Sequence, residues 1–291
     1  MSTAFAHKGV RFIFVGWTAF IAENLILSQN RDYLIDKLGG EDNYHHCYNT
    51  LSTLACASIA WGYFRHGRGQ GPTFLSSGSP TAMVKRGIFG GSVPIRLLGF
   101  GLQALGFVGI SQSFPKLQIP VAFSSKPNAL GPSSLTPQQA GSIPPAPLPA
   151  AGLRMQCPID FKPADVPADG IYGVQRVTRH PSLWSLGLLG LGSAIATPFL
   201  SEFVLFGFPV VFALIGGAHQ DYRFRRAGTL TPEKDAKTSL IPFAALLEGR
   251  QEWAPLKTEI KWVNASAGIL VALGLALRRE MRWKRLLKSV K

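Results

Sequence analysis

Apolar residues gather in six windows along the chain, separated by polar or proline-rich segments. The windows cover residues 12–27, 51–64, 97–110, 183–197, 199–218 and 265–277. A helix that crosses the hydrocarbon core of a bilayer needs about 20 mostly apolar residues, and these windows reach or approach that length. The pattern therefore predicts a bundle of five or six transmembrane helices. A large soluble helical protein is the alternative that this pattern leaves open.

The predicted fold is an all-α, polytopic helix bundle with a long proline-rich insert. The insert, residues 113–170, holds 12 of the 21 prolines and has only Lys116 and Lys126 as charges before Arg154. Proline removes a backbone donor and favours extended backbone, so we expect a structureless connection suited to wrapping around a partner. The other predicted parts are the first three helices, a helical core and a basic tail, at residues 1–112, 171–277 and 278–291.

The charge of the chain is unusual in amount and in placement. Only 16% of the residues are charged, against about 25% in an average soluble domain, yet the net charge is +14. Such a charge on a soluble protein would indicate nucleic acid, but here the cations lie beside apolar windows, so we expect no nucleic-acid partner. The tail would place basic side chains on an anionic lipid surface, such as one containing cardiolipin. These are Arg278, Arg279, Arg282, Lys284, Arg285 and Lys288.

The first half of the chain gives two further indications of its placement. Residues 65–94 carry basic residues and no acid, so the positive-inside rule puts this loop and the N-terminus on the side from which the protein is inserted. The stretch before the first apolar window is too short for a cleaved targeting peptide. We therefore expect the first helix to be retained as an anchor.

Candidate chemistry in this half is sparse. His45 and His46 are adjacent, and neighbouring helical residues point about 100° apart, so we predict no metal site there. The cysteines, Cys47, Cys56 and Cys157, form no CxxC pair and indicate neither a disulfide framework nor a zinc site. Glu23 lies within a predicted span. It is either a functional carboxylate or a group near the membrane interface.

The second half contains three polar groups of residues beside apolar windows. In RVTRHP, residues 176–181, Pro181 favours a helix start and puts Arg179 and His180 at the headgroup level. His180 is a switch, base or ligand, or an interfacial anchor. After the fifth window, Asp221 is one turn from Arg225, so an ion pair is available, and His219 is a second candidate for cofactor binding.

The third polar group is KTSLIPFAALLEGRQEW, residues 237–253, in which Pro242 interrupts any helix. Its short apolar stretch indicates a re-entrant or interfacial segment, and Glu248 can pair with Arg250 or with Arg179. We predict that the polar groups form one structural cluster at a helix entrance. Its members are Arg179, His180, Asp221, Arg223, Glu248 and Arg250.

These segments resemble the NnrU family of polytopic membrane proteins, in particular its zeta-carotene isomerase branch. The resemblance rests on RVTRHP, on HxDxR at residues 219–223, and on KTSLIPFAALLEGRQ at residues 237–251. The resemblance implies an integral membrane protein. For the isomerase branch it also implies an enzyme that holds haem b through two histidines and isomerises a cis double bond in a carotenoid. The short TRHP motif is also similar to one in membrane methyltransferases of the isoprenylcysteine type, whose later acidic motif is not evident here.

The positions that the resemblance assigns to haem ligands do not carry ligands in this sequence. By an ungapped comparison the first histidine falls at residues 23–25 and the second near Ser193, with a ligand-competent cysteine near Gly190. Neither serine nor glycine replaces an imidazole or thiolate on iron. We therefore predict no catalytic residue and no cofactor, with haem b as the alternative. The weak candidates for haem binding are His180 and His219.

The combined prediction is a non-catalytic accessory subunit of a complex in an organellar inner membrane. That complex would be respiratory, an ATP synthase or photosynthetic, with the mitochondrion favoured over the plastid. The predicted partners are other membrane-protein subunits and anionic phospholipids. The alternative function is a haem-dependent enzyme that resembles a carotenoid cis–trans isomerase.

Overall fold

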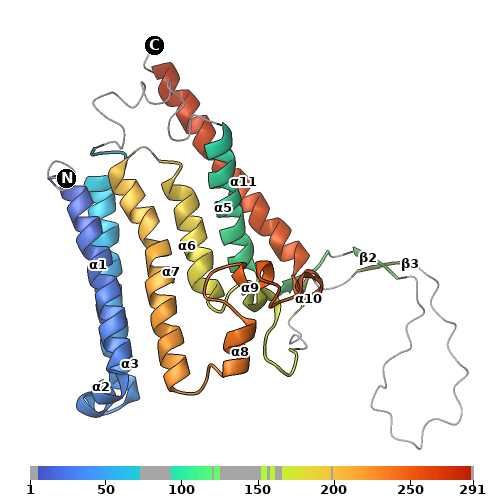
Figure 1. Ribbon diagram of the computed structural model, residues 1–291. Coiled ribbons are helices and arrows are strands. Elements are labelled where there is room, and N and C mark those ends of the chain that lie inside the picture. The colour runs from blue at the N-terminus through green and yellow to red at the C-terminus, as the bar shows by residue number, and fades with distance from the viewer. Residues whose placement is uncertain are drawn as a thin grey trace, which may run out of the picture. The chain divides into compact units, whose positions relative to one another are not determined.

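A computed structural model of the protein describes residues 6–72, 93–119, 121–124, 152–155, 158–160, 166–197 and 199–289. The described chain is almost entirely helical (Figure 1). All six apolar windows form helices, so the all-α helix bundle predicted from the sequence is confirmed. These helices are α1 (Lys8–Gln29), α3 (Glu41–Gly62), α5 (Val93–Ser111), α6 (Pro181–Ala194), α7 (Leu200–Arg226) and α11 (Trp262–Ser289).

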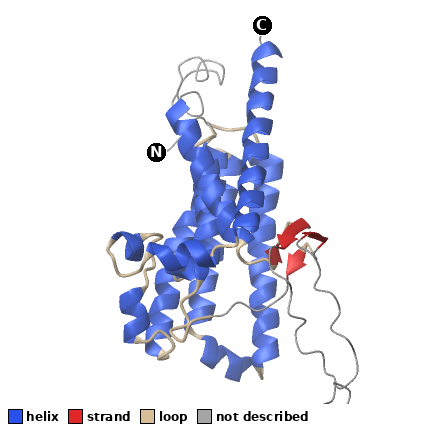
Figure 2. Ribbon diagram, turned by 90° about the vertical axis from the view of Figure 1, so that its right-hand side faces the viewer, coloured by secondary structure: helices blue, strands red, loops and turns tan. Residues whose placement is uncertain are grey.

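The long helices pack side by side in one sequence, α3–α1–α7–α6–α5–α11. Figure 1 shows α7, α6, α5 and α11 in this order, with α1 and α3 overlapping at the blue end, and Figure 2 shows the same helices from the side. Aromatic side chains join α1 to α7, where Phe14 and Trp17 meet Phe208, and Phe20 meets Phe212. Because the contacts advance together along both helices, α1 and α7 run parallel.

Short elements complete the two ends of the bundle. At one end, α2 (Arg31–Leu38) connects α1 to α3, and α8 (Pro232–Lys237), α9 (Ala244–Leu247) and α10 (Trp253–Glu259) lie between α7 and α11. At the other end, the π-helical turn η1 (Tyr63–Gly67) follows α3. Ser201, in the first turn of α7, donates a hydrogen bond to the carbonyl of Gly67 at 2.7 Å, so this end also holds the start of α7.

Glycines let the central helices approach closely. A Cβ on Gly106 of α5 would lie 2.7 Å from backbone atoms of α6, and one on Gly190 of α6 would lie 2.4 Å from the carbonyl oxygen of Phe206 on α7. Real Cβ atoms are not found at such distances, so a larger residue would force the backbones apart. Small residues at helix interfaces are typical of bundles in membranes, where close packing replaces the hydrophobic driving force.

Among the described residues, α1, α5 and α7 are long and apolar enough to cross a membrane. A fourth span arises if α10 and residues 262–279 of α11, which are bent by 83° at the break between them, count as one. These helices are consistent with an integral membrane protein. By the same criterion α6 is too short, at 14 residues, and α3 is not apolar enough, since it begins with the polar run EDNYHH. The sequence pattern alone predicts five or six spans.

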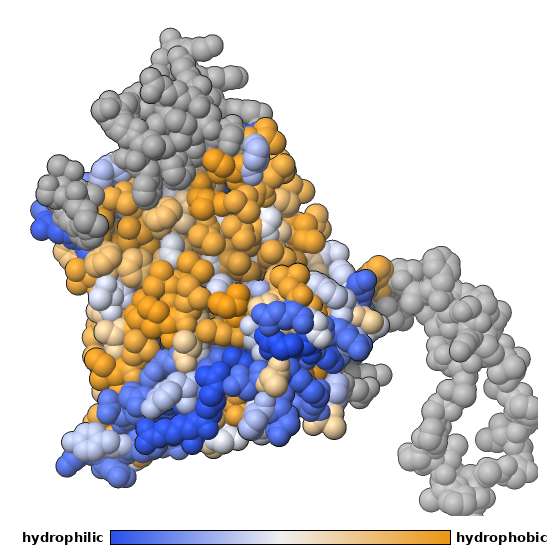
Figure 3. Space-filling model, viewed as in Figure 1, coloured by the Kyte–Doolittle hydropathy of each residue, from blue (hydrophilic) through white to orange (hydrophobic). Residues whose placement is uncertain are grey.

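The surface agrees with that assignment. Many large apolar side chains are exposed on the long helices, including Val15 at 63% and Leu54 at 62%. Figure 3 shows hydrophobic residues across the middle of the face in view and hydrophilic residues gathered at the end that holds α2 and α8. An apolar surface of this kind is costly in water but suits the hydrocarbon core of a bilayer.

Residues Pro115–Ala164 form a separate compact unit. Strand β1 (Lys116–Leu117) pairs antiparallel with β4 (Ile159–Asp160), and β2 (Val121–Ser124) pairs antiparallel with β3 (Gly152–Met155). The prediction of a structureless insert is therefore wrong at these strands, because the backbone of short segments between the prolines pairs in antiparallel ladders. The proline-dense stretch SIPPAPLPA, residues 142–150, lies outside the described residues.

Candidate functional site

A buried polar cluster lies where α6 begins and α7 ends, and its centre is the pair Arg179 and Asp221. The guanidinium of Arg179 donates two-pronged hydrogen bonds to the Asp221 carboxylate, with Nη2 at 2.6 Å from Oδ2 and Nε at 3.2 Å from Oδ1. The Arg179 side chain is 10% exposed and that of Asp221 is 3% exposed. A hydrogen bond of 2.8 Å joins His180 Nε2 to Asp221 Oδ1. Two neighbouring residues directly before α6 thus share one carboxylate of α7.

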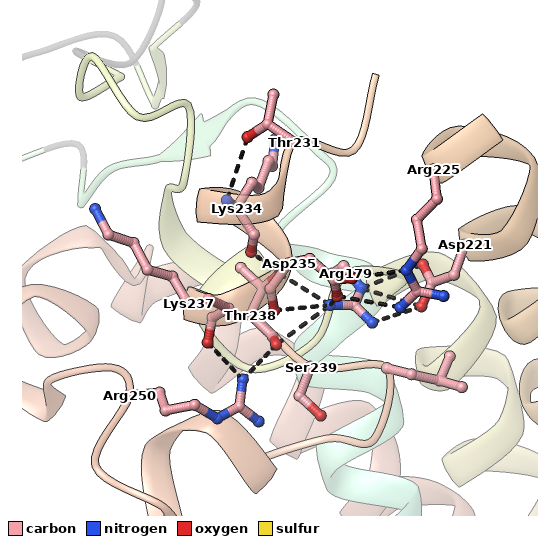
Figure 4. Close-up of polar contacts among 12 residues, drawn as sticks. Arg179, Asp221, Arg225, Thr231, Lys234, Asp235, Lys237, Thr238, Ser239 and Arg250 are labelled. Atoms are coloured by element: carbon pink, nitrogen blue, oxygen red, sulfur yellow. Dashed lines mark hydrogen bonds and ion pairs between the residues drawn. The ribbon is translucent and has the colours of Figure 1, made fainter. Parts of the chain in front are cut away.

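A second carboxylate extends the cluster to α8. Arg179 Nη1 lies 2.7 Å from Oδ1 of Asp235 and 3.2 Å from the carbonyl oxygen of Thr238, as Figure 4 shows. Arg225 also donates to Asp235, from Nε to Oδ2 at 2.6 Å. The hydrogen bonds from Arg225 and the charge of Arg179 hold the pKa of Asp235 below its usual value. The Arg179 guanidinium therefore connects the start of α6, the end of α7 and α8.

Backbone hydrogen bonds fix the same segments to each other. The amide of Arg179 donates to the carbonyl of Ser239 at 2.9 Å, and the amide of Phe243 donates to the carbonyl of Val177 at 2.9 Å. Between them, Thr178 Oγ1 donates to the carbonyl of Leu240 at 2.7 Å. Thr178 thus bonds across to the loop before α9 and does not cap α6. These contacts place the loop before α9 alongside the entrance of α6.

The apolar stretch in this region forms only the four-residue helix α9, after a break at Pro242. Phe243, which precedes it, has a φ of 65°, in the left-handed region that a bulky residue rarely adopts. Ala245 and Leu246 are buried, and Leu247 is 77% exposed. The segment is therefore a short plug anchored by two residues against the bundle, and its length is far below that of a span.

A neighbouring ion pair was not predicted from the sequence. Arg176 in the 3-10 turn η3 (Gly173–Arg176) forms a two-pronged pair with Glu259 at the end of α10, with distances of 2.6 and 2.7 Å. Its Nη1 also donates to Gln251 at 2.9 Å. Each partner lies at least 75 residues away in the chain. Neither spacing nor composition indicates a pair at that separation.

The remaining predicted cluster residues are placed in different ways. Arg250 donates to the carbonyl of Thr238 at 2.6 Å, which Arg179 also contacts, and it pairs with Glu248 at 2.6 Å on the surface. The sequence left open whether Glu248 pairs with Arg250 or Arg179, and the structure pairs it with Arg250. Arg223 points elsewhere: it donates to Ser28 Oγ of α1 at 2.7 Å and ties the ends of α1 and α7 together.

The expected pair between Asp221 and Arg225 is not formed, and this is a correction to the sequence prediction. Asp221 faces Arg179 and His180, and Arg225 faces Asp235. The spacing of one helical turn makes a local pair available on the helix surface. However, Asp221 is buried and Arg225 is half exposed, so the partner of Asp221 must come from the element packed against it.

Two other ionisable residues stand apart from the cluster. Glu23 accepts a hydrogen bond from Ser52 Oγ of α3, and the neighbouring Asn24 accepts one from Tyr48. His219 has a buried Nε2 for which the described part of the chain supplies no hydrogen-bond partner. His180 Nε2, by contrast, is occupied by Asp221.

The positions assigned to haem ligands by resemblance are closely packed. Ser193 Oγ accepts a hydrogen bond from Gln103 of α5 at 2.8 Å and donates one to Leu189 at 2.9 Å. At Gly190, even a methyl group would overlap the backbone of α7. Between these helices the described residues leave no room for a macrocycle, so they do not fit a haem at that place.

The basic tail and the cysteines offer little further chemistry. The tail is helical as far as Ser289, and the side chains of Arg282, Lys284, Arg285 and Lys288 lie outside the described residues. Arg278 is exposed and Arg279 is half-buried. Cys47 and Cys56 are free thiols. Over the described ranges, no three histidine, cysteine, aspartate or glutamate side chains gather in a way that could hold a metal ion.

The fold and the site together define a class of protein: an all-α polytopic bundle, consistent with an integral membrane protein, with a buried ion-pair cluster at one end. No known protein family, curated protein or solved structure matches the chain. The resemblance to the NnrU family therefore stays a prediction from the motifs.

Proposed function

We propose that the protein is a non-catalytic membrane subunit, whose polar cluster holds helix ends together and whose apolar surface binds other membrane proteins. The observation that carries this proposal is the set of hydrogen bonds that the Arg179 guanidinium makes within the protein. It donates to Asp221, to Asp235 and to the carbonyl of Thr238. Every nitrogen of this guanidinium donates to a neighbouring element, so the side chain joins three segments that lie far apart in the sequence.

The assembly that we propose is a complex of an organellar inner membrane, with the mitochondrial membrane favoured. Support comes from the exposed apolar side chains on α1 and α3, from the low-charge insert, and from the basic tail, which suits anionic phospholipids. The NnrU-like motifs belong to the same proposal, because RVTRHP and residues 237–251 contain the groups that form the ties between segments.

Extraction of the full-length protein from its native membrane with a mild detergent tests the proposal. On native electrophoresis we expect a species far larger than the 31.5 kDa monomer with bound detergent. A harsher detergent that dissociates membrane complexes provides the control, because it should release the monomer. A single monomeric species in the mild detergent would contradict a role as a subunit.

The haem-dependent enzyme is the second candidate, and one observation favours it: the buried Nε2 of His219 has no hydrogen-bond partner among the residues that the structure describes. The absorption spectrum of the purified protein decides between the candidates. A stoichiometric Soret band that disappears in His219→Ala or His180→Ala would overturn the non-catalytic proposal. A spectrum without that band, from protein expressed with an adequate haem supply, would remove the alternative.

A further inference from the structure

A cavity of about 250 Å³ lies beside the polar cluster, between the entrance of α6, the last turns of α7 and α8. Its walls include Gln175, Arg179, Phe224, Thr229, Leu230 and Lys234. Sites that enclose drug-sized ligands measure about 300–1,000 Å³, so this cavity suits a smaller group. It lies beside the last turn of α7, beyond the apolar part of that helix. If this apolar part crosses the bilayer, the cavity lies at the level of the lipid headgroups.

Asp221 lines the cavity and Asp235 lies beside it, and both carboxylates are already paired with arginines. Both oxygens of Asp221 accept hydrogen bonds from Arg179, and Oδ1 also meets His180. Asp235 is held by Arg179 and Arg225 through both of its oxygens. Leaving His180 out of the count, three cations (Arg179, Arg225 and Lys234) face two acids (Asp221 and Asp235), so these five residues carry a net charge of 3 − 2 = +1.

The surplus positive charge is that of Lys234. Its ammonium forms no ion pair with the described residues, and the carboxamide of Gln175, on the same cavity wall, makes no hydrogen bond to them. Phe224 and Leu230 add apolar surface to the cavity. An ammonium, an amide donor and an apolar wall suit a ligand with an anionic group attached to an apolar body.

We propose that this cavity binds the phosphate of a phospholipid headgroup, with Lys234 as its main charged contact and Gln175 as a second donor. Lysine binds phosphate as a point charge, and phosphate oxygens accept several donors at once. The volume admits the phosphate and its glycerol, and the acyl chains would extend along the apolar surface of α7. Free phosphate shares the recognition chemistry and is the competing source of the group.

The test uses the purified full-length protein in mild detergent. The probes are dihexanoyl phosphatidylglycerol below its micelle concentration, dihexanoylglycerol, which lacks the phosphate, and inorganic phosphate, with binding measured by isothermal titration calorimetry. We expect saturable binding of the phospholipid, at least tenfold weaker binding in Lys234→Gln, and recovery in Lys234→Arg. The matched control is Lys257→Gln, which removes the same charge from an exposed residue outside the cavity and should bind as the native protein does.

Each result decides the proposal. Equal affinities for the native protein and Lys234→Gln, or equal binding of dihexanoylglycerol and the phospholipid, would overturn it. Inorganic phosphate that binds as tightly as the phospholipid would assign the cavity to free phosphate and overturn the lipid as the source. Weak competition by millimolar phosphate, together with the loss in Lys234→Gln, supports the headgroup. The proposal does not depend on whether the protein is a subunit of a complex.

Discussion

At the scale of single residues, the pairing of Arg179 with Asp221 is the contact that the rest of the cluster depends on. Both side chains are almost fully buried, and Asp221 also holds His180. Removing one partner from a buried ion pair leaves an uncompensated charge in a region of low dielectric, and such changes typically cost about 3–5 kcal/mol. Exposed pairs are worth less than about 1 kcal/mol, because water screens them.

Asp221→Ala should therefore destabilise the protein by about 3 kcal/mol, the lower part of that range, because Arg179 keeps its pair with Asp235. The control is Glu248→Ala, which removes a carboxylate from the exposed pair with Arg250 and should change the free energy of unfolding by less than about 1 kcal/mol. Denaturation with SDS in mixed micelles, followed by tryptophan fluorescence, measures both. Similar losses for the two variants would show that burial of the Arg179 pair contributes nothing.

Asp235 gives the cluster a dependence on pH. Its folded pKa is lowered, with the hydrogen bonds from Arg225 as the largest cause. A lowered pKa means that the carboxylate contributes stability above its unfolded pKa of about 3.9, and that this contribution is lost as the pH falls through the folded pKa. The tie between α8 and Arg179 should weaken in the same range.

We expect the amides of residues 229–239 to lose protection from hydrogen exchange below about pH 4, after correction for the intrinsic pH dependence of exchange. Asp235→Asn should have lower protection at neutral pH and lack this acid-dependent loss. The difference between the two profiles isolates Asp235 from other acids of the cluster. Parallel profiles in both proteins would contradict the assignment.

At the scale of elements, the glycines of α5 and α6 determine how closely the central helices pack. The Cβ of an alanine at position 106 would overlap the backbone of α6, whereas one at position 101, on the same helix, would meet nothing within 4 Å. The two positions therefore separate the effect of helix packing from that of helix propensity. In a helix interior, glycine is destabilising by roughly 0.5–1 kcal/mol relative to alanine.

Gly106→Ala should destabilise the bundle by about 1–3 kcal/mol, the usual cost of overpacking a close interface. Gly101→Ala should leave stability unchanged or raise it by up to about 1 kcal/mol. The midpoint of thermal unfolding in mild detergent, followed by circular dichroism, measures both variants. A stable Gly106→Ala protein would mean that α5 and α6 can separate at little cost.

The elements also show what the sequence could predict. The helices α1, α5, α7 and α11 followed from their apolar windows, because a run of apolar residues of that length has few other stable arrangements. The ion pair of Asp221 did not follow. Its partner is 42 residues away, and sequence spacing reports only contacts within one helix. Asp235 was missed for the same reason, although Thr231 and Pro232 before it mark the start of α8.

At the scale of the whole molecule, the end that holds both termini of the helical bundle carries basic residues with few acids among them, whereas the other end carries both. The start of α1, the end of α3 and the start of α7 meet at η1. The start of α5 packs on the end of α6. Helix α11 begins beside the end of α5 and runs back along it, so α11 ends near the start of α5. Basic residues at this end include Lys8, Arg11, Arg65, Arg68, Arg96 and Arg278.

The positive-inside rule places this end on the side from which the protein is inserted. The number of crossings then becomes testable. If all six long helices cross, both chain ends lie on that side. If only α1, α5 and α7 cross, the count is odd and the ends lie on opposite sides. If α1, α5, α7 and α11 cross, both chain ends again lie on the insertion side. Residue 70 would then lie on the same side as α2, since α3 would not cross.

Labelling with a membrane-impermeant maleimide distinguishes these cases. In a background with the three native cysteines replaced by serine, single cysteines are placed along the chain and sealed vesicles are labelled from one side. The probes are Ala6→Cys, Asp36→Cys, Gln70→Cys, Ala168→Cys, Ala236→Cys and Ser289→Cys.

We expect positions 6, 70 and 289 to react from the insertion side, and positions 36, 168 and 236 from the other. If the cysteine at position 70 is labelled from the same side as the one at position 36, α3 stays on one side of the membrane. If the cysteine at position 168 is labelled from the same side as the one at position 6, the same holds for α6. Either result would mean that a helix which packs within the bundle does not span the membrane.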